Sequence, residues 1–166
     1  VLWHWNDSRL QSVQQNRESQ DKNFSYTAIF HIGKDLFVRL ADEEVRSAVT
    51  YPRGDFAIGF DSSPYELIGA MSGQSFRDIY RIDLNTGEKK LILKELPGSA
   101  GVPVSPDGKL LLYYLEGHYH VYNLHTDESV NITQNIPTSF VNKTNDVNVS
   151  FPPTPSWGWT SDSRHI

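Results

Sequence analysis

The sequence contains no cysteine and comparatively few basic residues, and these two deficits exclude several classes of protein. Without cysteine, neither disulfides nor thiolate zinc sites can form. Lys and Arg number 15 against 20 Asp and Glu, so the formal net charge is -5. Proteins that bind nucleic acids need a basic surface for the phosphates. We therefore expect no nucleic-acid partner.

Long apolar runs are also missing. No stretch approaches the roughly 18 apolar residues of a membrane-spanning helix, so we expect no membrane span. The chain begins at Val1 with neither a starting Met nor a basic leader, and we interpret it as a mature or excised piece. What it does contain is 12% aromatic residues, 11 glycines and 9 prolines. Aromatic residues favour strands, whereas Gly and Pro favour turns. The composition predicts an all-β protein.

Two segments 40 positions apart, 78–88 and 118–128, share one pattern of strand, turn and strand. Thr86 and Glu88 of the first segment match identical residues in the second. A fainter copy covers 28–40. Because repeats of this size identify whole architectures, the pattern predicts repeated units of β-structure.

A turn sequence precedes each unit. Ser105-Pro106-Asp107-Gly108-Lys109 is its clearest form, and related sequences occupy 51–55 and 160–164. Pro fixes φ at the first corner and Gly accepts a positive φ, so Pro-Asp-Gly predicts a hairpin. Each unit then has four strands. The expected strands are 47–51, 56–60, 78–84 and 89–94 in the second unit, and 101–105, 110–115, 118–124 and 129–133 in the third.

Four-stranded antiparallel units that recur every 40–55 residues or so are typical of β-propeller blades. We predict a partial propeller of about three blades. The units are approximately 1–46, 47–100 and 101–150, with the start of a further blade at 151–166. Both ends look cut, so we expect either a longer parent protein or copies that associate as a homo-oligomer.

Four segments lie outside the expected strands and are interpreted separately. Trp3-His4-Trp5 is interpreted as a strand fragment, and the polar residues 8–23 as a short helix or an excursion. Two inserts, 61–77 and 134–155, are expected to be loops, and Pro152, Pro153 and Pro155 forbid a helix in the second.

Several of these segments resemble the β-propeller domain of prolyl oligopeptidase-family serine peptidases, in the dipeptidyl-peptidase-like branch, and the related TolB-like propellers. The resemblance rests on Trp3-His4-Trp5-x-Asp7 with the Gln-rich segment after it, on 40–44, on the turn at 105–109 and on 77–87. It implies a periplasmic or extracellular gate that helps to bind peptide substrates and precedes a separate C-terminal α/β-hydrolase domain. The alternative is a TolB-like propeller that binds proteins without enzymatic activity.

The chain lacks the catalytic machinery of such peptidases. No Gly-x-Ser-x-Gly nucleophile elbow occurs, and Gly73-Gln74-Ser75 lacks the glycine and the strand–turn–helix context that an elbow needs. We therefore predict no catalytic residue, no cofactor and no peptidase activity in this chain, although the parent protein is expected to be a hydrolase.

The candidate substrate-binding residues are Glu43 and Glu44. In dipeptidyl peptidases a pair of propeller glutamates binds the amino terminus of the substrate, and the resemblance assigns this role to Glu43 and Glu44. Two carboxylates suit an ammonium group, which offers three hydrogen-bond donors. The aromatic residues that flank the family's pair are absent, however, since Ala41-Asp42 precedes it. The alternative is a solvated acidic turn.

Other polar and aromatic motifs also have two interpretations. His118-x-His120 places two imidazoles on one face of a strand, but no third ligand is near in sequence, so we predict no metal site. Trp157-Gly158-Trp159 and Trp3-x-Trp5 suit either packing between sheets or a stacking platform for sugars or peptides. Five Asn-x-Ser/Thr triplets suit either glycosylation or chance; they begin at Asn6, Asn23, Asn131, Asn142 and Asn148.

Overall fold

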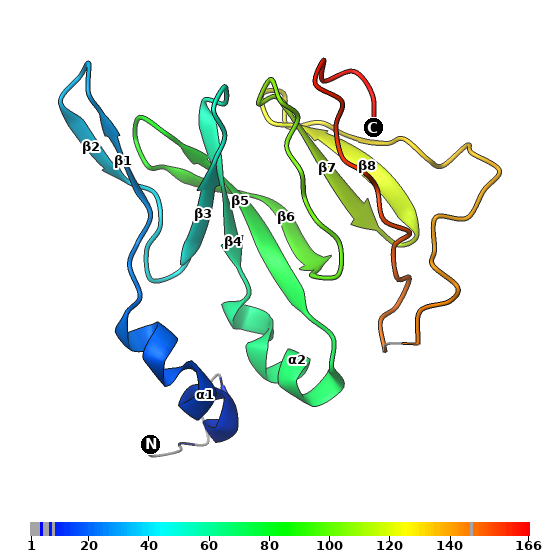
Figure 1. The fold of residues 1–166 in the computed structure, drawn as a ribbon, viewed down its shortest axis with the longest axis horizontal. Coiled ribbons are helices and arrows are strands. Elements are labelled where there is room, and N and C mark those ends of the chain that lie inside the picture. The colour runs from blue at the N-terminus through cyan, green and yellow to red at the C-terminus, as the bar shows by residue number, and fades with distance from the viewer. Residues whose placement is uncertain (1–3, 5–6, 8, 147) are drawn as a thin grey trace.

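Antiparallel strands dominate the computed structural model, which describes residues 4, 7, 9–146 and 148–166 (Figure 1). A two-stranded sheet pairs β1 with β2, a four-stranded sheet has the order β3-β4-β5-β6, and a three-stranded sheet has the order β7-β8-β9. The strands are β1 Ala28–His31, β2 Leu36–Arg39, β3 Ser47–Thr50, β4 Phe56–Asp61, β5 Phe76–Asp83, β6 Lys89–Pro97, β7 Leu110–Leu115, β8 His118–Asn123 and β9 Ser129–Asn131. The expected all-β class is confirmed at this level: the chain is mostly sheet with few helices.

The two sequence copies adopt the same turn. Asp83 and Asn123 are equivalent, and the backbone N–H of each donates to the carbonyl five residues on, at 3.0 and 2.8 Å. The side-chain oxygen of each also accepts from the backbone N–H two residues on, at 2.8 and 2.9 Å. The fifth position has a positive φ in both, 74° at Gly87 and 60° at Asp127. The same local side-chain hydrogen bond and one left-handed residue thus stabilise the turn in both copies.

The turn that precedes each unit also has the same structure in two copies, 105–110 and 160–165. The hydroxyls of Ser105 and Thr160 donate to the aspartate two residues on, at 2.6 and 2.5 Å, and accept from the N–H five residues on, at 2.9 and 3.1 Å. The fourth residue has a positive φ in both copies, 75° at Gly108 and 60° at Ser163. Asp107 and Asp162 therefore act as turn-stabilising acceptors.

One expected strand is much shorter than predicted. Residues 101–105 contribute only an isolated bridge between Val104 and Leu111, with two backbone hydrogen bonds from 103–105 to β7. Pro103 cannot donate to a ladder, which limits the pairing of this segment. The other strands expected between 47 and 133 are present, with ends shifted by up to three residues.

Three hydrophobic clusters connect the sheets in series. The first joins β2 and residues 40–45 to β4 and β5; the second joins β4, β5 and β6 to β7 and β8; the third joins β7 and β8 to the C-terminal segment. Along β4, Ala57 belongs to the first cluster and Ile58 to the second, because successive side chains point to opposite faces. Leu111 and Leu112 divide in the same way on β7. Both faces of the middle sheet are therefore covered.

Equivalent turns of successive sheets touch. A Cβ on Gly108 would stand 2.5 Å from the Cα of Gly54, so the two backbones meet without side chains between them. On the other side of the same turn, the N–H of Asp107 donates to Oγ of Ser163 at 3.1 Å. The turns at 51–55, 105–109 and 160–164 thus lie side by side.

Both helices lie at the end of the sheets opposite these turns (Figure 1). Helix α1 (Gln11–Lys22) confirms the helical alternative for 8–23. Helix α2 (Glu66–Ser72) follows the 3-10 turn η1 (Ser63–Tyr65), so the expectation of a loop over 61–77 was wrong. Pro64 suits the first turn of a helix, and Gly73 ends α2 in the left-handed conformation. Neither helix combines the length and the apolarity of a membrane span within the part of the chain that is described.

The described residues of the second insert, 134–146 and 148–155, form a loop as predicted, apart from a bridge between Val141 and Pro153. The strand fragment expected at Trp3-His4-Trp5 lies largely outside the described residues.

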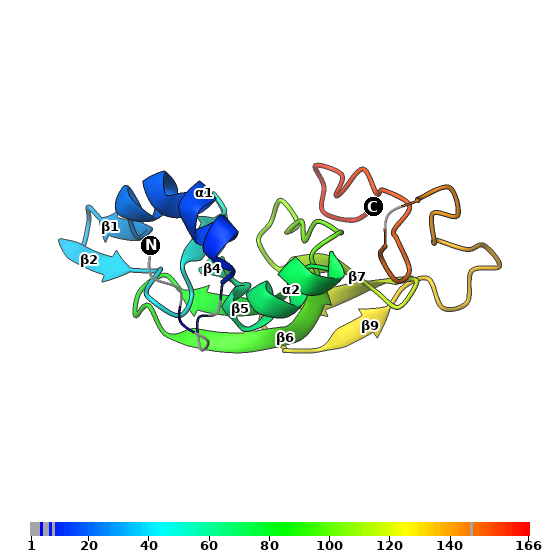
Figure 2. The same ribbon diagram turned by 90° about the horizontal axis from the view of Figure 1, so that it is seen from below.

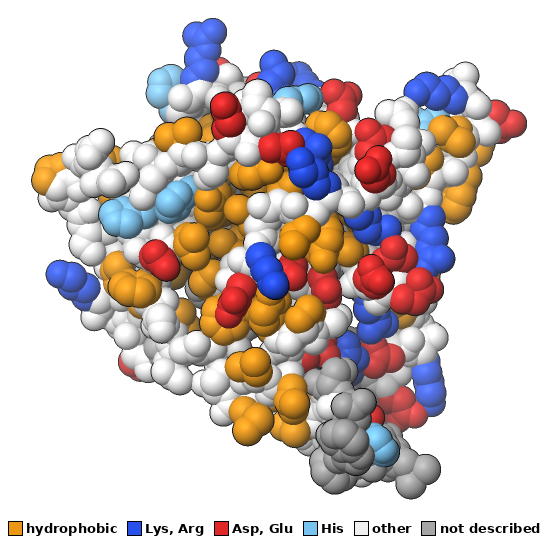
Figure 3. All heavy atoms as spheres, turned by 180° about the vertical axis from the view of Figure 1, so that it is seen from behind, with side chains coloured by type: hydrophobic (Ala, Val, Ile, Leu, Met, Phe, Trp, Pro, Cys, Tyr) orange, Lys and Arg blue, Asp and Glu red, His pale blue; other side chains and the backbone are white. Residues whose placement is uncertain are grey.

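Viewed from below, the sheets follow one another across the molecule, with β6 and β9 on one side (Figure 2). Charged side chains gather beside the N-terminal sheet and α1, whereas hydrophobic side chains occupy the middle of the face in Figure 3.

Candidate functional site

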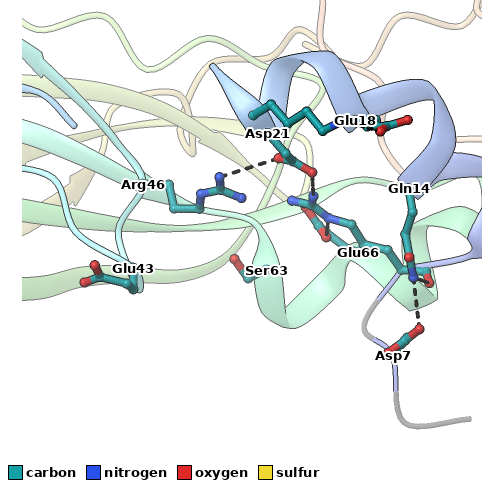
Figure 4. Close-up of a pocket in the computed structure, with 10 residues that line it drawn as sticks. Asp7, Gln14, Glu18, Asp21, Glu43, Arg46, Ser63 and Glu66 are labelled. Carbon is teal, nitrogen blue, oxygen red and sulfur yellow. Dashed lines mark hydrogen bonds and ion pairs between the residues drawn. The ribbon is translucent and has the colours of Figure 1, made fainter. Parts of the chain in front are cut away.

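A charged cleft of about 650 Å³ opens between α1, the turn at 42–46 and the start of α2 (Figure 4). We call it the N-terminal cleft. Its described lining residues carry five carboxylates and three cationic side chains, so negative charge is in excess. They are Asp7, Arg9, Gln14, Glu18, Asp21, Lys22, Glu43, Arg46, Ser63 and Glu66.

Arg9 organises the interior of the cleft. Its Nη2 donates to Oε1 of Glu66 at 2.9 Å while Nε contacts Oε2, which gives a bidentate pair between the N-terminal segment and α2. Its Nη1 reaches Asp21 on α1 at 3.0 Å, and Arg46 approaches the other oxygen of Asp21 at 3.5 Å. The hydrogen bond with Glu66 is the main reason that the pKa of Arg9 is raised. The negative charges of Glu66 and Asp21 are therefore already paired with arginines of the protein.

Asp7 and Gln14 form the mouth of the cleft near α1. Gln14 Nε2 donates to Asp7 Oδ2 at 3.0 Å, and the backbone N–H of His4 donates to the same oxygen at 3.0 Å. The bond from His4 and then that from Gln14 hold the pKa of Asp7 below its ordinary value. Asp7 is therefore an anion at neutral pH.

Glu43 lines the cleft at its outer edge and lies apart from Asp21 and Glu66 in Figure 4. Its Oε1 accepts from Arg39 at 3.0 Å and from the hydroxyl of Tyr26 at 3.2 Å. The bond from Arg39 is the main cause of the lowered pKa of Glu43. Because the side chain is still 74% exposed, most of this carboxylate faces solvent and can meet a ligand.

Glu44 does not share this position. Its backbone N–H donates to Oδ1 of Asp42 at 3.1 Å, and the same oxygen accepts from Val45 at 2.8 Å. Asp42 also pairs with Lys89 of β6 at 2.6 Å. The turn therefore has a structural acidic residue, Asp42, while only Glu43 of the predicted pair is among the cleft residues.

The two histidines on β8 have other roles. Nδ1 of His118 lies 3.3 Å from the hydroxyl of Thr133, and His120 stacks on Tyr113 with ring centroids 5.0 Å apart. Burial lowers the pKa of His120, which favours the neutral ring. No group of three or more His, Asp or Glu side chains suited to a metal is found among the described residues.

The tryptophans at 157 and 159 do not form a platform. The segment is not a strand; Trp159 packs against the cluster of Leu112 and Tyr114 and donates Nε1–H to Pro103 at 3.0 Å. Trp157 is fully exposed instead. Gly158 lies between them with a positive φ of 85°, which breaks the strand alternation that placed both rings on one face. Trp3 and Trp5 lie outside the described residues.

Ser75 is not placed as a nucleophile. Gly73 is the C-cap of α2, and Ser75 directly precedes β5, so the order is helix, turn and strand, the reverse of an elbow. The backbone carbonyl of Ser75 accepts from Gly98 at 2.8 Å.

Two sets of contacts at this end of the molecule were not predicted from the sequence. The bond between Arg9 and Glu66 joins residues 57 positions apart. The carboxylate of Asp78, 5% exposed, accepts from Tyr65 at 2.6 Å and from the N–H of Glu95 at 2.8 Å. Only the three-dimensional fold brings these partners together.

The sequence matches no family model and shows no significant similarity to a curated protein.

Proposed function

We propose that this chain is a non-catalytic β-propeller segment of a secreted or periplasmic prolyl oligopeptidase-family serine peptidase. In this proposal the segment limits access to the active site of a C-terminal α/β-hydrolase domain and helps to bind the peptide substrate. The family assignment comes from the sequence resemblance at Trp3-His4-Trp5-x-Asp7 with the Gln-rich segment after it, and at 40–44, 77–87 and 105–109.

The observation that carries the propeller assignment is the repetition of contacts between neighbouring sheets. Nε2 of His31 on β1 lies 2.8 Å from the carbonyl oxygen of Leu84 in the next sheet. Nη1 of Arg81 on β5 contacts the carbonyl of Leu124, the equivalent residue one sheet further on. Propeller blades are radial repeats that each contact the next in the same way. The touching turns at Gly54 and Gly108 fit the same arrangement.

The N-terminal cleft supports peptide binding through charge. Its carboxylates outnumber its cations, and Glu43 keeps an exposed anion at the rim. The amino terminus of a peptide is an ammonium group, which forms its strongest hydrogen bonds with carboxylates. We therefore place the amino terminus of a bound peptide at Glu43.

Binding of Ala-Ala-Ala and of its N-acetyl form, measured by calorimetry, tests this role. We expect the free amine to bind at least tenfold more tightly, and Glu43→Gln to remove most of that advantage. Glu128→Gln, on a turn at the opposite end of the sheets, is the matched control. Equal affinities for the two peptides would contradict the role of Glu43 and favour the TolB-like alternative of a protein-binding platform.

The chain alone is expected to hydrolyse no dipeptide amide and to take up no fluorophosphonate label. The structure of the whole polypeptide encoded with it tests the architecture. We expect further four-stranded sheets around one axis and a separate domain with a Gly-x-Ser-x-Gly elbow. A polypeptide without such a domain would contradict the peptidase proposal.

A further inference from the structure

A second cavity, of about 710 Å³, lies between the start of β5, the loop at 99–103 and the C-terminal segment at 152–158. We call it the Arg77 cavity. Its walls include the apolar side chains of Phe60, Val102, Pro152 and Pro155. Among its described lining residues, Arg77 has the only charged side chain. The cavity is therefore lined by apolar and uncharged polar groups together with one cation.

The guanidinium of Arg77 is only partly satisfied. Nη2 donates to the carbonyl of Ala100 at 2.6 Å, and Cζ lies 5.0 Å from the ring centroid of Phe60. Nε is buried without a hydrogen-bond partner. None of the ion pairs between described residues includes Arg77. Burial lowers the pKa of this guanidinium, which is the effect expected when a charge loses water without gaining a counter-ion.

The neighbouring acids are engaged elsewhere. Asp78 follows Arg77 on β5, points to the other face of the sheet and is bound by Tyr65 and Glu95. Glu66 is bound by Arg9, and Asp61 accepts from the N–H of Ser63 at 2.8 Å. A half-buried cation without an anion is unfavourable, and an anion supplied by a ligand would remove that cost.

We infer that the Arg77 cavity binds the carboxylate of a peptide, either its carboxyl terminus or an acidic side chain. A guanidinium matches the planar carboxylate better than any other side chain. Apolar walls and the amide of Asn142 suit the rest of a peptide, and the volume is within the range of ligand sites. The choice of a peptide over another carboxylate rests on the proposed function, whereas the anion site rests on Arg77 alone.

Calorimetry with N-acetyl-Ala-Ala-Ala and with its carboxyl-terminal amide tests the inference on the unaltered chain. Acetylation removes the amino group from both probes, so the result is independent of Glu43. We expect the free carboxylate to bind at least tenfold more tightly than the amide. Equal affinities would overturn the inference even if the free amine proves to matter at Glu43.

Variants locate the effect. Arg77→Met should abolish the preference for the carboxylate, and Arg77→Lys should retain part of it because it keeps the cation. Arg53→Met, on the exposed turn at 51–55, is the matched control and should leave the preference unchanged. A preference that survives in Arg77→Met would overturn the assignment to Arg77.

Inorganic phosphate is the second probe and separates peptide carboxylates from small anions. We expect 10 mM phosphate to compete with the peptide by less than twofold. Displacement of the peptide by phosphate at much lower concentration would overturn the peptide assignment.

The melting temperature of the variant distinguishes a binding role of Arg77 from a purely structural one. Loss of an uncompensated charge in Arg77→Met should leave the melting temperature of the free chain unchanged or raised, whereas a purely structural Arg77 predicts a fall with peptide binding intact.

Discussion

Two regions of the molecule are held together in opposite ways. Between the sheet of β4–β6 and the sheet of β7–β9, a cluster of buried side chains that includes Ile58, Leu96 and Leu111 fills the interface. Helix α1, in contrast, has no buried residue. Ion pairs from Arg9 and Arg17 connect the N-terminal segment and α1 to Glu66, and Arg46, just before β3, pairs with Asp21 of α1.

This difference separates the contacts that stabilise the fold from those that position side chains on its surface. Burying apolar area contributes about 25 cal/mol per Å², and this contribution is not screened by salt. Exposed ion pairs contribute about 0–1 kcal/mol each and are screened by salt. The sheets therefore provide the stability, while the charged contacts set the shape and potential of the N-terminal cleft.

The largest effect is expected from truncation inside the sheet interface. Leu111 is fully buried in the second cluster, so Leu111→Ala should lower the free energy of unfolding by about 2–5 kcal/mol, measured by urea denaturation. The control is Ile32→Ala, at a position that is 89% exposed, which should change it by less than about 0.5 kcal/mol. A loss below 1 kcal/mol at Leu111 would mean that this interface is not the main source of stability.

The contact between turns should give the next largest effect. Gly108 combines a φ of 75° with the close approach to Gly54, so Gly108→Ala should cost about 2 kcal/mol. Gly33→Ala is the matched control, because no atom lies within 4 Å of the new Cβ. If the two variants unfold at the same urea concentration, the turns do not determine how closely the sheets approach.

Acid sensitivity should be smaller and confined to the ionic contacts. The bond from Lys90, followed by that from Tyr122, lowers the pKa of Asp127 below its ordinary value of 3.8. Burial, followed by the bond to Asp127, raises the pKa of Tyr122 to about 12. A carboxyl with a depressed folded-state pKa stabilises the fold above the unfolded pKa, and this is lost as the pH falls through the folded value. Asp127→Asn should flatten the fall in stability below about pH 4. Parallel stability curves for the two proteins would contradict this assignment.

The smallest change in global stability is expected at the N-terminal cleft. Arg46→Gln removes the exposed ion pair with Asp21 of α1 and should lower the free energy of unfolding by about 1 kcal/mol or less. Trypsin should nevertheless cut at Arg17 several times faster, because α1 is then held by fewer contacts. A loss as large as that of Leu111→Ala would erase the contrast between the two regions.

Local chemistry explains which elements were predictable from the sequence. The turns after Asp83 and Asn123 follow from residues within five positions, so the strands around them were found. Helix α2 was missed because its seven residues are too few to show a helical period. The strand at 101–105 was overestimated because Pro103 limits its pairing.

The candidate sites depend on contacts between distant residues and were therefore harder to predict. Glu43 was named as a candidate from the family resemblance and stays a prediction, and its partners Arg39 and Tyr26 and its separation from Glu44 became visible only in the fold. The isolation of Arg77 is likewise a property of the space around it.

The turns and the helices occupy opposite ends of the sheets, and this arrangement has a consequence for insertions and deletions. A residue added to the turn at 84–87 that shifted β6 by one position against β5 would exchange the buried and exposed faces of β6. Residues added next to α2 or within 134–140 lengthen only connections that lie outside the ladders, at a small entropic cost. The helical end is therefore free to change length, and with it the outline of the N-terminal cleft, while the strand register stays the same.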